Sequence, residues 1–342
     1  MSSLRRLVLK ATALVLTTSS LGLAALSARA DVTLLNVSYD VTREFYKDYN
    51  QAFARHWKQT TGETLTLNQS HGGSSKQAGS VVAGLAADVI TMNQASDIDI
   101  LAERGGLVPS DWAKGLPHNS SPTTSVTVIL VRKGNPKQIK DWSDLARPGV
   151  SVVIPNPKTS GNGRYSYLAA WGSVIKAGGK PEQARALVQK IFANVPVFDG
   201  GGRAATTTFA QRNIGDALVT FESEVPLIQN EFAGDYQVVY PKTTILAENP
   251  VSVVDKVVDK KGSRKQAEAY LRYLYSDEGQ AIAVKHNLRP RAAALLKQHQ
   301  GKFINVPTFT VDEVFGGWSK VQAEHFRDGG LYDQISLAGR AK

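Results

Sequence analysis

The chain has 342 residues, of which 42% are hydrophobic and 20% are charged, with 40 Lys and Arg against 30 Asp and Glu. This is ordinary globular composition, which excludes a disordered chain, a collagen and a coiled coil, and the length predicts about two domains. The absence of cysteine excludes a disulfide framework, a thiolate metal site and a cysteine nucleophile. The six histidines form no metal-binding motif, so we expect no metal and no cofactor.

The first 30 residues have the pattern of an export signal. A basic start with Arg5, Arg6 and Lys10 is followed by an apolar stretch that ends in Ala28-Arg29-Ala30, a typical cleavage sequence. We expect cleavage after Ala30 and a periplasmic location. The apolar stretch is interrupted by polar residues 17–20 and is too short to be a membrane anchor. The paired arginines also suit twin-arginine export, so this route and the general secretory route both stay open.

Short β-rich runs alternate with helical stretches after residue 30, which predicts an α/β fold with mostly parallel sheets. The predicted elements in chain order are strand 33–38, helix 41–60, strand 64–68, helix 76–85, strands 88–92, 125–132 and 150–155, helices 165–176, 181–192 and 204–212, strands 217–221, 236–240 and 251–258, and helix 265–286. The clearest helix is 41–60, because one apolar stripe recurs there at four-residue spacing from Val41 to Trp57. Asp40 is the expected N-cap of this helix.

Two turn-rich stretches, 109–122 and 241–250, divide the chain into two lobes. We expect the chain to leave the first lobe near residue 122 and to return near residue 246. The predicted domains are a cleaved signal at 1–30, lobe 1 at 31–122 plus 246–342, and lobe 2 at 123–245.

Four places share one pattern, in which a strand leads through a loop of small residues into a helix: Asn36–Asp40, Gln69–Gln77, Pro155–Tyr165 and Asp199–Thr208. The first N–H groups of a helix lack intrahelical partners and carry partial positive charge, and glycine lets the backbone approach a ligand. Several helix starts that meet at one point would bind an anion without a charged side chain. Each loop taken singly is more simply a connection. Four in one chain favour a site, and none of them matches a P-loop, a dinucleotide fingerprint or a nucleophile elbow.

Five stretches resemble the periplasmic sulfate- and thiosulfate-binding proteins of ABC importers: Leu34–Asp40, Gln69–Ser74, Val131–Lys137, Leu168–Gly172 and Val314–Trp318. The resemblance covers essentially the whole chain after the signal. It implies a two-lobed periplasmic-binding-protein fold (type II), with a mostly parallel sheet flanked by helices in each lobe and the ligand in the cleft. It also implies delivery of the anion to permease subunits that a separate ATPase drives. We expect a monomer that binds no nucleic acid.

The same resemblance implies backbone N–H donation to the anion from Asp40, Ser74, Gly161, Asn162 and Gly202, with the Ser74 hydroxyl as a further donor. Asn162 stands where the family often has a second glycine. This departure matters little, because the contact is a main-chain N–H.

The larger departure is Phe221, where the sulfate-binding pattern has an indole donor. Phenylalanine cannot donate, so a hydrogen bond to a charged ligand worth about 1.5–3 kcal/mol is missing. The stretches Phe221–Glu224 and Asn156–Asn162 are similar to those of thiosulfate-preferring members. A larger, softer sulfur atom would pack on the Phe221 ring, but the preference between sulfate and thiosulfate stays open.

Three further polar residues lie in or after these loops. Arg164 and Arg203 are either countercharges behind the ligand or, as we favour, ion-pair partners of acids such as Asp199 or Glu222. His71 is expected to be structural.

Two other functions are weighed against this one. An exported sulfur-ester hydrolase would need a nucleophile with a base, or a metal, and no such cluster is found, so we do not expect an enzyme. A binder of molybdate or phosphate is the alternative. Phosphate keeps a proton near neutral pH and needs an acceptor in its site. If the Asp40 carboxylate caps its own helix, the site holds donors alone and favours sulfate or thiosulfate.

Overall fold

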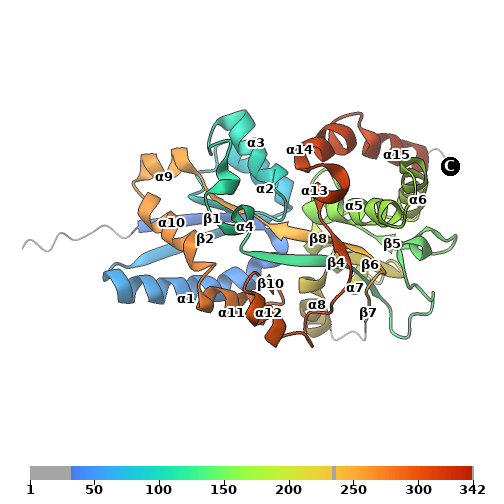
Figure 1. Cartoon of the computed structure of the whole chain (residues 1–342), viewed down its shortest axis with the longest axis horizontal. Helices are drawn as coiled ribbons and strands as arrows, with labels where there is room; N and C mark the ends of the chain where they lie inside the picture. The colour runs from blue at the N-terminus through green and yellow to red at the C-terminus, as the bar shows by residue number, and fades with distance from the viewer. Residues whose placement is uncertain (1–31, 233–235, 341–342) are drawn as a thin grey trace, which may run out of the picture. The chain divides into compact units, whose positions relative to one another are not determined.

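Two β-sheets flanked by helices make up the part of the chain that the computed structural model describes, residues 32–232 and 236–340 (Figure 1). The predicted export signal and its cleavage site lie outside these residues. No helix in the described ranges combines the length and the apolar character that a membrane span requires.

The first sheet has the strand order β2-β1-β3-β9. Its strands are β1 (Val32–Tyr39), β2 (Leu65–Gly72), β3 (Val89–Thr91) and β9 (Val251–Val253), and β1 pairs in parallel with both of its neighbours. The helices that belong to this sheet are α1 (Arg43–Thr61), α2 (Ser74–Val82), α3 (Ser96–Gly105), α9 (Asp255–Lys261), α10 (Arg264–Tyr273) and α11 (Asp277–Lys285). The predicted apolar stripe of α1 is confirmed, since Phe45, Tyr49, Phe53 and Trp57 are buried against α10.

The second sheet has the order β11-β8-β4-β6-β5, and the short strands β7 and β10 also pair with β4. Its strands are β4 (Thr123–Val131), β5 (Val152–Val153), β6 (Ala217–Phe221), β7 (Gln237–Val239), β8 (Thr244–Asn249), β10 (Arg289–Pro290) and β11 (Thr308–Phe309). The prediction of mostly parallel sheets is wrong here, because β4 is antiparallel to β6, β7, β8 and β10. Parallel neighbours need a crossover connection, as between β5 and β6, but the alternation of strands and helices along the sequence does not fix which strands become neighbours.

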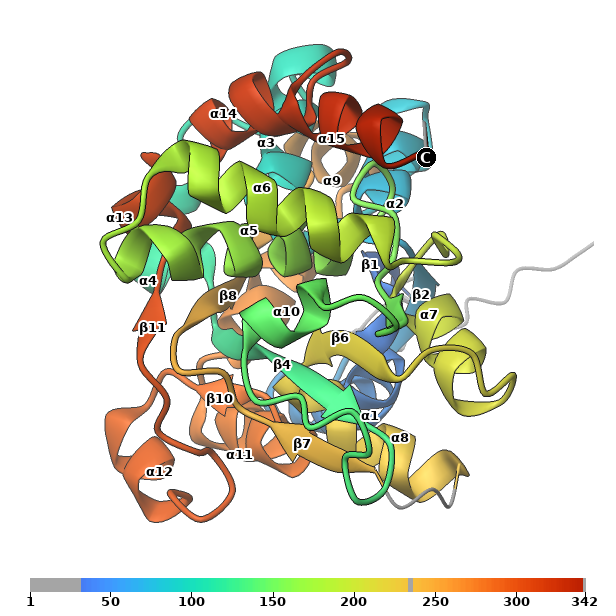
Figure 2. The ribbon, with the colours of Figure 1, turned by 90° about the vertical axis from the view of Figure 1, so that its right-hand side faces the viewer.

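The helices α5 (Gly161–Lys176), α6 (Pro181–Ala193), α7 (Gly202–Ala210) and α8 (Val225–Phe232) pack around the second sheet. The C-terminal segment joins them, as Figure 2 shows for α15 beside α6. Its helices are α12 (Ala293–Gln298), α13 (Val311–Phe315), α14 (Trp318–Val321), a π-helical turn (Gln322–Phe326) and α15 (Leu331–Arg340). Phe315, Phe326 and Ile335 share one apolar cluster with α5 and α6.

This packing bears on the predicted lobes. The chain enters the second sheet at Thr123 and passes from β8 to β9 of the first sheet at Pro250, close to the two positions expected from the sequence. The sequence reading put all of 246–342 in lobe 1, whereas Val311 to Ile335 contribute to the core of the second sheet. We therefore propose to assign residues from 308 onward to lobe 2.

Other predicted elements differ in their ends. The predicted helix 265–286 is two helices, because Ser276 caps α11 by accepting a hydrogen bond from the Gly279 N–H at 3.1 Å. The predicted strand 251–258 ends at Val253, where α9 follows. Strand β8 lies inside the stretch predicted to be a turn. The Asp40 cap is also wrong, since Asp40 lies in a 3₁₀ turn (Asp40–Thr42) and Thr42 precedes α1.

Candidate functional site

The first and fourth loops meet through Asp40. Its carboxylate accepts a hydrogen bond from the backbone N–H of Arg203, the second residue of α7, at 3.1 Å. This contact explains why Asp40 does not cap α1: its side chain is directed to a helix of the other sheet. The Asp40 carboxylate therefore has a hydrogen-bond donor within the protein. The sequence suggested that a helix cap would engage this carboxylate; the Arg203 N–H engages it instead, which likewise supports a ligand site made of donors.

The second loop meets the third and fourth at Gly73. A Cβ atom on Gly73 would lie 2.6 Å from the carbonyl oxygen of Thr159 and 2.7 Å from that of Gly200, so only glycine fits here. Gly73 is also the N-cap position of α2 and has no side chain to cap it. The close approach brings the start of α2 next to the loops that lead into α5 and α7.

The third and fourth loops meet at Asn162 and Gly202. A Cβ atom on Gly202 would lie 3.2 Å from Asn162 Nδ2, and this same amide donates to Thr220 Oγ1 at 3.4 Å. Asn162 is buried in the first turn of α5. The four loops that the sequence singled out are thus gathered at one place, together with the residues predicted to donate from the backbone: Asp40, Ser74, Gly161, Asn162 and Gly202.

The Ser74 hydroxyl is engaged with the protein. It donates to the Asp97 carboxylate, and the Ser75 hydroxyl donates to the other oxygen of the same carboxylate at 2.8 Å. Asp97 lies in the first turn of α3, a helix that was not predicted from the sequence. A hydroxyl donates one hydrogen bond. The Ser74 hydroxyl could therefore donate to a ligand only by giving up its hydrogen bond to Asp97.

Arg164 and Arg203 form ion pairs, as favoured from the sequence, but with other acids. Arg164 is buried, its Nη1 lies 3.9 Å from Asp97 Oδ1, and its Nε donates to the Pro157 carbonyl at 2.8 Å. Arg203 pairs with Glu231 at 2.5 Å on the surface. The expected partners are engaged elsewhere: Asp199 accepts from Thr208, and Glu222 pairs with Arg289.

Phe221 is buried at the end of β6. Its ring lies 5.7 Å from the ring of Tyr165, edge to face at 72°, and Tyr165 belongs to the first two turns of α5. The ring therefore stands beside the third loop, where a large sulfur atom would have apolar contact. Nothing in this packing supplies the donor that an indole would bring.

Two buried carboxyls make this region less favourable for a further negative charge. Burial raises the pKa of Asp40, while the hydrogen bond from the Arg203 backbone opposes the rise. Burial raises the pKa of Glu224 still more strongly, and the nearby Asp40 adds to this effect. Sequence reasoning did not single out Glu224, although it lies in the stretch Phe221–Glu224.

The remaining polar candidates do not form a metal site. His71 lies with its Nδ1 3.4 Å from the Tyr39 carbonyl oxygen, and burial lowers its pKa. Within residues 32–232 and 236–340, no group of three or more histidine, aspartate and glutamate side chains could hold a metal ion.

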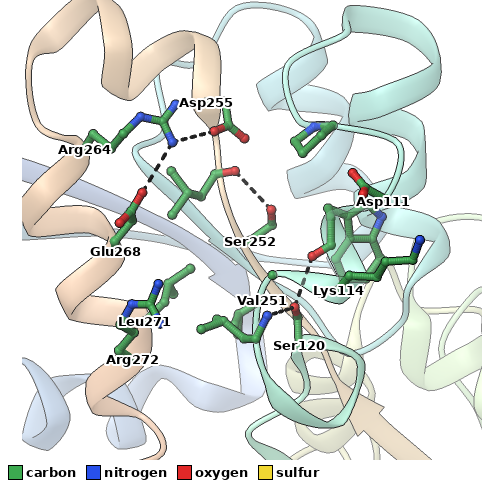
Figure 3. A pocket seen from close by; sticks show the side chains of 15 residues that line it. Asp111, Lys114, Ser120, Val251, Ser252, Asp255, Arg264, Glu268, Leu271 and Arg272 are labelled. Atoms are coloured by element: carbon green, nitrogen blue, oxygen red, sulfur yellow. Dashed lines mark hydrogen bonds and ion pairs between the residues drawn. The ribbon is translucent and has the colours of Figure 1, made fainter.

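A cavity of about 390 Å³ lies away from these loops (Figure 3). None of the predicted site residues lines it. Arg264, its most prominent cation, is already bound to Asp255 at 2.7 Å and lies 3.5 Å from Glu268. Acidic and basic side chains line it in equal number, so this cavity is a poorer anion site than the helix starts.

The chain is similar to known proteins over most of its length. A family model described as bacterial extracellular solute-binding protein matches residues 34–289. The thiosulfate-binding protein of Pseudomonas aeruginosa is 61% identical, over 90% of this chain and 93% of that protein. The sulfate-binding protein of Escherichia coli is 54% identical, over 92% and 96%. The sulfate-binding protein SubI from Mycobacterium tuberculosis has a TM-score of 0.78 at 28% identity, and the match covers 86% of this chain and 100% of that one.

Proposed function

The chain belongs to the family of bacterial extracellular solute-binding proteins, and we propose that it is an exported receptor that binds sulfate or thiosulfate. The observation that carries this proposal is the meeting of the starts of α2, α5 and α7 around Gly73 and Gly202. Unpaired N–H groups at helix starts stabilise an anion, because they are fixed donors and need no reorganisation when the ligand arrives.

The proposed ligand contacts are main-chain N–H groups of Asp40, Ser74, Gly161, Asn162 and Gly202, and the ring of Phe221. Micromolar binding corresponds to about −8 kcal/mol. Several charge-assisted hydrogen bonds supply this even after the anion has lost its water. The donors carry no net charge, so the bound dianion is stabilised without a buried cation at contact distance.

Phe221 makes thiosulfate the better candidate of the two anions. The ring offers apolar contact and no donor, which suits a sulfur atom better than an oxygen. Overall similarity does not decide the ligand, because relatives of both names are more than half identical to this chain. Phosphate and molybdate are the alternative ligands, and for phosphate one acceptor near the loops, the Asp40 carboxylate, already has a donor in the backbone N–H of Arg203.

Delivery requires partners. We propose that the exported protein, as a monomer, presents its anion to the permease subunits of an ABC importer, whose ATPase is a separate chain. Catalysis is not part of this function, since the site offers donors for binding rather than a nucleophile with a base.

Calorimetric titration of the purified, anion-free protein with sulfate, thiosulfate, phosphate and molybdate tests the proposal. We expect micromolar or tighter binding of sulfate and thiosulfate, and binding of phosphate weaker by about a hundredfold or more, because its proton would face a donor. Equal affinity for all four anions, or preference for phosphate, would overturn the assignment.

A further inference from the structure

Asn93 is a buried side chain at the meeting point of the loops. It follows β3, in the connection to α3, and only 2% of it is exposed. Its amide oxygen Oδ1 has no hydrogen-bond partner within the part of the chain that the structure describes. A buried polar atom without a partner is costly, so it calls for a partner that the protein itself does not supply.

The position of Asn93 places its amide at the proposed anion site, where the anion can be a partner for Nδ2 but not for Oδ1. A Cβ atom on Gly161 would overlap Asn93 Oδ1, so the amide lies directly against the first residue of α5. The preceding residue, Met92, has its sulfur 3.4 Å from the hydroxyl of Ser74, the first residue of α2. The Asn93 amide therefore lies against the start of α5, and the residue before it contacts the start of α2.

We propose that Asn93 is a further ligand-binding residue, which selects fully deprotonated tetrahedral anions by turning its Nδ2 toward them. This inference rests on the proposed function. The oxygen and nitrogen of an amide differ little in size, and rotation about the last side-chain bond exchanges them. With Nδ2 toward the ligand the amide adds a donor, and a donor rejects an anion that brings a proton of its own.

The change Asn93→Asp tests the selection, because it keeps the shape and replaces a donor by an acceptor. We expect the affinities for sulfate and thiosulfate to fall by about a hundredfold or more, since the new carboxylate repels a dianion. Binding of hydrogen phosphate, whose proton the carboxylate accepts, should rise by about tenfold or more over the wild-type protein. A gain for one anion with a loss for another cannot come from damage to the fold.

Asn36→Asp is the matched control. Asn36 is equally buried, but it lies inside β1 before the loop, and both ends of its amide already have protein partners, Tyr270 and Thr91. This control should reduce stability and leave the order of anion preference unchanged. Asn93→Ala provides a second measurement if Asn93→Asp does not fold. It should weaken sulfate and thiosulfate by about tenfold, with no gain for phosphate.

Three outcomes would overturn the inference: Asn93→Asp with the wild-type order of preference, Asn93→Asp that loses every anion without any gain for phosphate, or Asn93→Ala with wild-type sulfate and thiosulfate affinity. Failure of the proposed function is a different result, since in that case the wild-type protein itself would bind neither sulfate nor thiosulfate.

Discussion

The Asp40 carboxylate accepts a hydrogen bond from the backbone N–H of Arg203 at 3.1 Å, although 163 residues separate the two in the chain. Asp40 follows β1, an inner strand of the first sheet, and Arg203 is the second residue of α7, which packs on the second sheet. A protein carboxylate thus occupies part of the helix start that a bound dianion would use. A dianion bound as in the proposed function would compete with this carboxylate for the helix start, and this relationship leads to the first two predictions.

Replacement of Asp40 by Asn should strengthen anion binding. The change keeps the backbone N–H of residue 40 and an oxygen that accepts from Arg203, but it removes the negative charge. We expect sulfate and thiosulfate to bind more tightly by about 1–2 kcal/mol, the scale for a unit charge some ten Å away or less in a protein site. Calorimetric titration measures this, with Asp259→Asn on exposed α9 as the control. Weaker binding by the Asp40 variant would show that its charge does not oppose the ligand.

Buried carboxyls should also make stability depend on pH. The pKa values of Asp40 and Glu224 are raised above their usual values of 3.8 and 4.5 by burial. Between the usual and the raised values the folded protein holds more protons than the unfolded one, so stability falls as pH rises through that window. We expect the urea midpoint of Asp40→Asn and of Glu224→Gln to fall less than that of the wild type between acid and neutral pH. Parallel pH profiles for all three proteins would contradict this.

The change Phe221→Trp should shift preference toward sulfate. An indole N–H adds a donor worth about 1.5–3 kcal/mol to a charged ligand. The larger ring must fit beside Tyr165, so the free energy of unfolding should fall by about 1–3 kcal/mol. Titration with both anions measures the preference, and Phe221→Leu, which removes the ring without adding a donor, is the control. The same ratio of sulfate to thiosulfate affinity before and after the change to Trp would defeat the idea.

Two substitutions of Gly202 distinguish the loss of its N–H group from crowding by a new side chain. Gly202 is the first residue of α7, a position where proline is compatible with a helix, so Gly202→Pro deletes the N–H while keeping the fold. We expect it to weaken binding by about 1.5–3 kcal/mol. Gly202→Ala keeps the N–H but places a Cβ 3.1 Å from Val41, and it should weaken binding less. If alanine is as damaging as proline in the titration, crowding rather than donation explains the loss.

Arg164 and Arg203 should differ in their contribution to stability. Arg164→Met leaves Asp97 as a buried charge without its cation, and we expect the free energy of unfolding to fall by about 3–5 kcal/mol. Arg203→Met removes an exposed pair with Glu231 and should cost about 0–1 kcal/mol. Urea denaturation of both variants without ligand makes the comparison. Similar losses in the two would mean that the Arg164 pair is not specially coupled to the core.

Several features could be predicted from sequence because they depend on neighbouring residues. The apolar stripe of α1 appears at helical spacing, and β6 was predicted with its exact ends, 217–221, because an apolar run there is bounded by polar residues. Strand β8 was missed because two prolines flank it, although it is held by pairing with β4. The pairing partner is more than a hundred residues away and leaves no local signal.

The sequence by itself determined the four strand-loop-helix segments and the residue types within them, since glycine, serine and helix-starting patterns act over a few positions. Only the tertiary structure decided that these segments meet, that Asp40 turns to α7 instead of capping α1, and that Arg164 pairs with Asp97. The physical reason is that each of these contacts joins residues from different elements. Their partners are chosen by the packing of the two sheets, which no local pattern encodes.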